Sequence, residues 1–158
     1  MNLLENEKKY YGLFYIKQII LLFWGAWFFI AFLTNVTDFL MNTETISPTL
    51  FHSGDYSALA KVIHVYSTPH YFLNILFSLD VLIEGTSAFL FLIAALCFWK
   101  RVYSWQTINI AFLISISLWA VFLLMEEIFI AYSYEATHLR LLTSEMISLL
   151  MLHLLPHQ

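Results

Sequence analysis

The sequence predicts an all-α integral membrane protein, built as a bundle of four transmembrane helices that run up, down, up and down. Of the 158 residues, 61% are hydrophobic and only 11% are charged, whereas soluble domains average about 25% charged residues. Apolar stretches long enough to cross a bilayer, which takes about 20 residues, recur along the chain. All 9 Tyr residues lie at or beyond the ends of these stretches, as is typical of membrane–water interfaces. We expect one domain over residues 1–158.

The first span is expected at about residues 19–40, because residues 19–33 carry no charge. This stretch exceeds the apolar region of a cleaved signal peptide, which is usually about 7–15 residues, and no small-x-small cleavage site follows it. We therefore expect a retained anchor. The second span is expected at about residues 69–98. Thr68-Pro69 supplies an N-cap with proline at the first helical position, and Lys100-Arg101 follows its end.

The third span is expected at about residues 105–132 and the fourth at about residues 137–155, where Pro156 stops the helix. Short connections make the later spans antiparallel neighbours. The long connection between the first two spans contains a turn at Ser53-Gly54-Asp55, after which apolar residues recur at helical spacing. This predicts a short amphipathic helix over residues 55–66 that lies on the outer surface, over the mouth of the bundle.

The basic residues predict the orientation. The side of the bundle that carries the two termini holds most of them, namely Lys8, Lys9, Lys17, Lys100 and Arg101. The other side holds Lys61 and Arg140. Because basic residues concentrate in cytoplasmic segments, we expect both termini in the cytoplasm and the protein in a cytoplasmic or inner membrane.

Composition excludes several classes of function. A single cysteine, Cys97, excludes a disulfide or a cysteine-based metal site within one chain. A formal net charge of −4 provides no basic surface for nucleic acid. The expected partner is the lipid bilayer, and assembly into a homo-oligomer or a larger membrane complex stays open.

Five carboxyl side chains fall inside the predicted spans, and no Lys or Arg lies in a span interior. Each charge near the centre of a span costs roughly 2.5–3.5 kcal/mol. All five are expected in the outer half of the membrane or near its midplane, which predicts a pocket that opens outward. They are Asp80, Glu84, Glu126, Glu127 and Glu145.

Helical spacing places several of these groups on shared faces. Asp80 and Glu84 are four residues apart, and His138 and Glu145 are seven residues apart, so each pair shares one face of its helix. Adjacent helical residues point about 100° apart. Only one of Glu126 and Glu127 is therefore expected to face the interior.

A bound metal ion is the occupant that we expect first, because it holds several carboxylates ionised together. Glu135 and His138 form a Glu-x-x-His pair, of which carboxylate-bridged di-iron bundles use two. Oxygen ligands with one histidine suit iron or manganese. These ligands predict a metal-dependent membrane oxidoreductase that acts on an apolar substrate. The first-choice ligands are Glu84, Glu127, His138 and Glu145, and the second choices are Asp80, Glu126 and Glu135.

Three alternatives stay open. One is proton- or cation-coupled transport through Asp80, Glu84 and Glu145, although the inner half of the bundle is apolar. Another is a small-molecule or lipid-headgroup pocket; its expected aromatic walls are Phe77, Trp119, Phe122 and Phe129. The third is a non-catalytic accessory subunit of a membrane complex, whose acids are protonated or paired, for example through Arg140 with Glu127 or Glu135.

The layout also resembles the small four-span proteins of the DoxX type, which place a Glu-Gly dipeptide in the second helix. Glu84-Gly85 occupies that place here. The resemblance covers the number of helices and this dipeptide, and it implies no function.

Overall fold

The computed structural model describes residues 3–100 and 105–155, with side chains from residue 13 onward. Arg101 and Pro156, used above to end two spans, lie outside the described residues, as do the side chains of Lys8 and Lys9. The described residues form helices joined by turns, with no strand, so the expected all-α fold is confirmed. The elements are α1 (Leu3–Asn42), α2 (Asp55–Ile63), the 3-10 turn η1 (His64–Tyr66), α3 (His70–Trp99), α4 (Trp105–Ile128) and α5 (Tyr132–Leu154).

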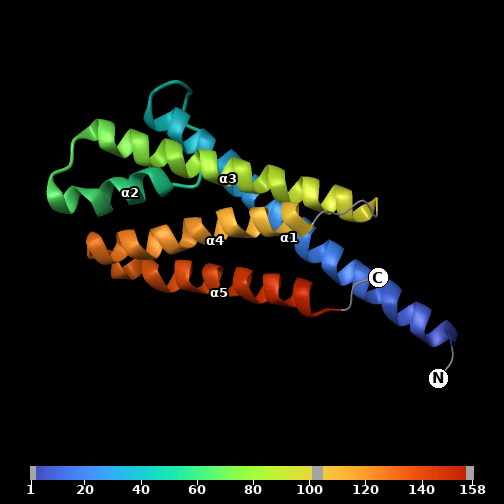
Figure 1. Cartoon of the computed structure of the whole chain (residues 1–158). Coiled ribbons are helices and arrows are strands. Elements are labelled where there is room, and N and C mark those ends of the chain that lie inside the picture. Colours follow the sequence, from blue (N-terminus) through green and yellow to red (C-terminus); the bar gives the residue numbers. More distant parts are fainter. Residues whose placement is uncertain (1–2, 101–104, 156–158) are drawn as a thin grey trace.

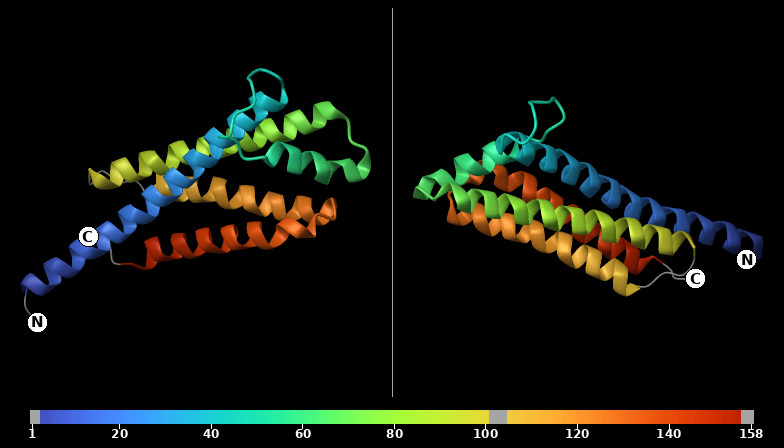
Figure 2. Two further views of the ribbon diagram at one scale, coloured as in Figure 1. Left: turned by 180° about the vertical axis from the view of Figure 1, so that it is seen from behind. Right: turned by 90° about the horizontal axis from the view of Figure 1, so that it is seen from above.

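The four long helices alternate in direction, so that α1 begins and α5 ends at the same end of the molecule (Figure 1). α1 packs on α3, α3 on α4 and α4 on α5, whereas α1 and α5 touch only a little. In Figure 2, α1 crosses the other long helices obliquely, and it makes few contacts with α5. The side of the bundle between α1 and α5 is therefore its loosest side.

Three helices are long and apolar enough to cross a membrane: Leu13–Asn42 within α1, His70–Trp99 and Trp105–Ile128. The structure supports three of the four expected spans in this way, and α5 is not among them. Three boundaries also differ from expectation, one of which is the start of α5 at Tyr132 instead of about residue 137. The first helix includes the segment before residue 19, and α4 ends at Ile128 because Ile130 adopts a left-handed conformation with φ 57° that turns the chain toward α5.

Close contact between α1 and α3 depends on two glycines. A Cβ atom on Gly25 would lie 2.9 Å from the side chain of Leu92, and one on Gly85 would lie 2.9 Å from the ring of Phe32. Without side chains at these positions, the two helices approach closely, as small residues allow in membrane bundles.

Aromatic rings in stacked and edge-to-face contact fill the middle of the bundle. Phe28 lies 6.0 Å from Phe91 and 5.7 Å from Trp119, and Phe91 lies 4.8 Å from Phe112, measured between ring centroids. All four side chains are buried. We call them the aromatic plug. Because they come from α1, α3 and α4, they join three helices into one core.

The short helix α2 forms where the sequence predicts it, and the turn η1 continues it to Tyr66. The helix runs alongside the first half of α3 (Figures 1 and 2), and it buries Tyr56 and Ile63 against Leu73 and Phe77. The end of the molecule formed by the end of α1, by α2 and by the beginnings of α3 and α5 is called the loop end below.

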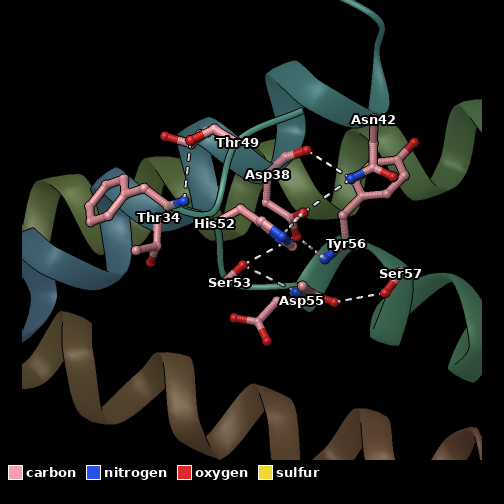
Figure 3. Close-up of polar contacts among 12 residues, drawn as sticks. Thr34, Asp38, Asn42, Thr49, His52, Ser53, Asp55, Tyr56 and Ser57 are labelled. Atoms are coloured by element: carbon pink, nitrogen blue, oxygen red, sulfur yellow. Dashed lines mark hydrogen bonds and ion pairs between the residues drawn. The ribbon is translucent and has the colours of Figure 1, made fainter. Parts of the chain in front are cut away.

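Asp38, near the end of α1, explains the position of α2. Its buried carboxylate accepts hydrogen bonds from the backbone N–H of Tyr56 at 2.8 Å and from Ser53 Oγ at 3.2 Å. Asn42 Nδ2 donates to it at 3.1 Å, and His52 Nδ1 lies 3.4 Å away (Figure 3). One side chain of α1 therefore holds both the connection and the first turn of α2.

Candidate functional site

A cavity of about 300 Å³ lies at the loop end, and all five α-helices contribute to its walls. Most of the lining is apolar. The polar lining includes Asn35, Asp55, Asp80, Glu84, Glu126 and His138, and the aromatic walls are Trp27, Phe77, Trp119, Phe122 and Tyr134. A concave and largely apolar cavity with a few convergent polar groups is typical of a small-molecule site.

His138 and Glu126 form the polar pair on the α4–α5 side of the pocket. His138 Nδ1 lies 2.5 Å from Glu126 Oε1 in a hydrogen bond. The imidazole stacks on Phe122 at 4.8 Å and on Trp119 at 5.8 Å, measured between ring centroids. Glu126 is only 5% exposed, and its Oε2 has no hydrogen-bond partner among the described residues. One oxygen of a buried carboxyl group in the pocket wall is thus left unsatisfied.

Glu84 and Asn35 form a second polar pair, on the α1–α3 side. Asn35 Nδ2 donates to Glu84 Oε2 at 2.8 Å, and both side chains are buried. The Oδ1 atom of Asn35 is buried and has no partner in the described part of the chain. Asp80 lies one turn before Glu84, and its buried Oδ1 is also without a partner there. Three acceptor atoms that belong to lining residues therefore have no donor in the described part of the chain.

The metal ligands expected first are not brought together. Glu84 and His138 line the pocket, but Glu127 and Glu145 do not. Because Glu126 faces inward, its neighbour Glu127 points away and is exposed. Glu145 lies two turns beyond His138, about 10 Å along the helix, where it is fully buried and accepts a hydrogen bond from Ser115 Oγ at 2.7 Å.

The second-choice ligands divide in the same way. Asp80 and Glu126 line the pocket, whereas Glu135 lies in the first turn of α5 outside it. Within residues 3–100 and 105–155, no group of three or more His, Cys, Asp or Glu side chains is arranged to hold a metal ion. The expected iron or manganese centre thus finds no ligand set in the described residues.

The charge of the lining is one-sided. Four carboxyl residues contribute to the walls, namely Asp55, Asp80, Glu84 and Glu126, and no lining residue is Lys or Arg. Arg140 forms no ion pair with Glu127 or Glu135 in the described part of the chain.

Two differences from the expected lining have physical causes. Phe129, expected as an aromatic wall, instead packs 5.4 Å from Tyr66 in the cluster around α2, because the chain turns just after α4. Asp55 lines the pocket although the sequence indicated only a turn there. Its place depends on the contact of Asp38 with the next residue, Tyr56, and no local pattern in the sequence indicates that contact.

No family model matches this chain, and no curated protein or solved structure shows significant similarity to it. The function proposed below therefore rests on the residues of the pocket.

Proposed function

We propose that this chain is a four-span membrane protein that binds a small, largely apolar molecule in the pocket at the loop end. The observation that carries the proposal is the burial of the Glu84 and Glu126 carboxyl groups in the wall of a largely apolar cavity of about 300 Å³. Buried ionisable groups within a membrane are costly, and they mark functional sites in membrane proteins. His138 and these carboxyl groups would hold the polar part of the ligand.

The fourth span in this proposal is α5. Its 23 residues extend about 34 Å at 1.5 Å per residue, which is enough for a hydrocarbon core of about 30 Å. Its outer face carries exposed apolar side chains, including Leu139, Met146, Ile147 and Leu150. Glu145, which lowers its average hydropathy, is buried inside the bundle. α5 thus keeps a carboxyl group inside and presents apolar side chains to lipid, together with the exposed Arg140, Thr143 and Ser144.

Contacts along α5 support the same placement. Trp24 Nε1 of α1 donates to Ser148 Oγ at 3.0 Å, and Lys17 Nζ donates to the carbonyl oxygen of Leu155 at 2.9 Å. His153 Nε2 lies 2.9 Å from Asn109 Oδ1 of α4. These bonds hold α5 to its neighbours from the middle of the bundle to its end. The basic residues near that end favour a cytoplasmic location for it.

Ligand binding is favoured over coupled transport and over metal-dependent oxidation. A transport path needs polar or hydrated steps throughout, and the aromatic plug of Phe28, Phe91, Phe112 and Trp119 fills the bundle next to the pocket. A metal-dependent reaction needs a ligand set, and the described side chains provide none. A binding pocket needs neither a continuous polar path nor a set of metal ligands.

The test is equilibrium binding of radiolabelled 4-phenylbutan-1-ol to the protein in lipid nanodiscs, with empty nanodiscs subtracted. We expect saturable binding of one molecule per chain. Ala31 lines the pocket, so Ala31→Trp places an indole in the cavity and should weaken binding at least tenfold. Ala26 is exposed on the same helix and does not line the pocket, so Ala26→Trp is the matched control and should bind normally.

The proposal fails if the alcohol, its amine analogue and its acid analogue all show only non-saturable partition into the bilayer. It also fails if Ala31→Trp and Ala26→Trp bind equally well, because the ligand would then lie outside the cavity.

A further inference from the structure

Among the residues that line the pocket, three buried acceptor atoms lack partners in the described part of the chain, against one buried donor, Trp119 Nε1. Glu126 Oε2, Asp80 Oδ1 and Asn35 Oδ1 are buried and have no partner among the described residues. Glu126 is 5% exposed and Asn35 is 2% exposed. Bulk water therefore has little access to these oxygen atoms and does not readily donate hydrogen bonds to them. An alcohol brings one O–H donor and a carboxylate brings none, whereas a primary ammonium group brings three N–H donors. The unsatisfied atoms therefore match an ammonium group best.

The sign of the charge leads to the same ligand class. Asp55 from α2, Asp80 and Glu84 from α3 and Glu126 from α4 line one cavity, and no Lys or Arg lines it. A positively charged ligand keeps these carboxyl groups ionised together, whereas an anionic ligand adds to their repulsion. The only lining group that can itself become positive is His138, which is already bonded to Glu126.

The aromatic walls can contact both the ammonium group and the apolar body of such a ligand. Trp27, Phe77, Trp119, Phe122 and Tyr134 line the cavity. Aromatic faces attract a cation within about 6 Å, and they also pack against an apolar body. A cavity of about 300 Å³ equals the volume of roughly ten water molecules at about 30 Å³ each. This volume suits one aromatic ring with a short alkyl chain.

The pocket also reaches the surface of the bundle between α1 and α5. Trp27 and Thr137 line it and are both exposed, and these two helices touch only a little. A molecule dissolved in the bilayer can therefore reach the cavity without crossing the aromatic plug.

Building on the proposed function, we infer that the ligand is a lipophilic cation, a small amine with an apolar aromatic or alkyl body. Its ammonium group binds beside Glu126, where the Asp80 carboxyl group of the same cavity adds to the attraction, and its apolar body packs against the aromatic walls. Glu126 is the principal determinant of the selectivity for a cation, because it has both a buried charge and a free oxygen.

The test compares three ligands that share one body, namely 4-phenylbutylamine, 4-phenylbutan-1-ol and 4-phenylbutyrate, in the nanodisc assay described above. We expect the amine to bind at least tenfold more tightly than the alcohol and the acid to bind most weakly. Glu126→Gln should reduce the ratio of amine affinity to alcohol affinity at least tenfold, which corresponds to about 1.4 kcal/mol. Glu127→Gln removes the same charge from the neighbouring exposed residue and is the matched control, with no change expected.

Asp80→Asn is the second variant, so that poor folding of one variant does not remove the test. It should also weaken the amine selectively. If the alcohol or the acid binds as tightly as the amine, the cation inference is wrong while the pocket proposal stands. If Glu127→Gln weakens the amine as much as Glu126→Gln does, selectivity comes from the overall charge of the protein, and the inference is also wrong. If none of the three ligands binds, the proposed function itself has failed.

Discussion

Replacement of Asp38 should release α2 from the bundle and open the pocket. The Asp38 carboxylate is the acceptor that joins α1 to the connection and to the first turn of α2. Asp38→Ala leaves the buried N–H of Tyr56 without a partner. Four lining residues, Asp55, Ala58, Leu59 and Val62, come from α2, so this one change should also disturb a wall of the pocket.

The size of the effect follows from which partners are buried. The N–H of Tyr56 is buried, and an orphaned buried donor costs about 1–3 kcal/mol. Ser53 and Asn42 are exposed, so water replaces most of what they lose. We therefore expect a cost of about 2 kcal/mol to the docking of α2, or about thirtyfold in the docking equilibrium. Asp38→Asn keeps one acceptor oxygen and should cost about half as much free energy.

Hydrogen–deuterium exchange of the α2 backbone amides measures this docking. In Asp38→Ala, amides after Tyr56 should exchange about thirtyfold faster than in the wild type, while the amides of α4 stay unchanged. Thr37→Val is the matched control, because Thr37 Oγ1 donates only to Leu33 of its own helix. Less than threefold acceleration in Asp38→Ala would refute the reasoning, because α2 would then be held by its apolar contacts alone.

Three further predictions follow. Gly25→Ala should lower the free energy of unfolding by about 1–3 kcal/mol. Gly85→Ala should lower it less, because the added methyl group at Gly25 approaches backbone as well as side-chain atoms. Reversible unfolding in mixed micelles measures both values, and equal costs would contradict the prediction. In a background that lacks Cys97, a cysteine that replaces His64 should react with an impermeant reagent from outside. A cysteine that replaces Lys100 should be protected, and so should a C-terminal epitope. An epitope on the opposite side of the membrane from Lys100 would show that α5 does not span. Purified protein should contain far less than one iron or manganese ion per chain by elemental analysis, and one tightly held ion per chain would restore the metal hypothesis.

The helices could be predicted from the sequence because the hydrocarbon core of a bilayer restricts which structures can cross it. Apolar stretches of a fixed length must become helices, since every backbone polar group in the bilayer needs an internal partner. The sequence analysis placed α5 among four spans, although α5 is less apolar than the other three because it carries polar residues on both its buried and its exposed faces, such as Glu145 and Arg140.

The details of the site depended on tertiary contacts that no local pattern records. Helical spacing showed that only one of Glu126 and Glu127 faces inward, but not which one, and the metal hypothesis used Glu127. Glu145 shares a helix face with His138, yet it does not line the same cavity. Its Oε2 accepts a hydrogen bond from Ser115, and its buried Oε1 has no partner among the described residues. The position of α2 depended on Asp38, which lies in a different helix.

The central claim is that a lipophilic molecule binds inside the bundle at the loop end. The most direct test is mapping by mass spectrometry of the adducts formed by 4-phenylbutylamine that carries a diazirine on its ring, in lipid nanodiscs. We expect adducts on lining residues such as Trp27, Phe122 and Leu141. Excess unmodified amine should suppress these adducts. Adducts confined to exposed apolar residues outside the pocket, such as Leu82 and Leu113, with no suppression by excess amine, would contradict the central claim.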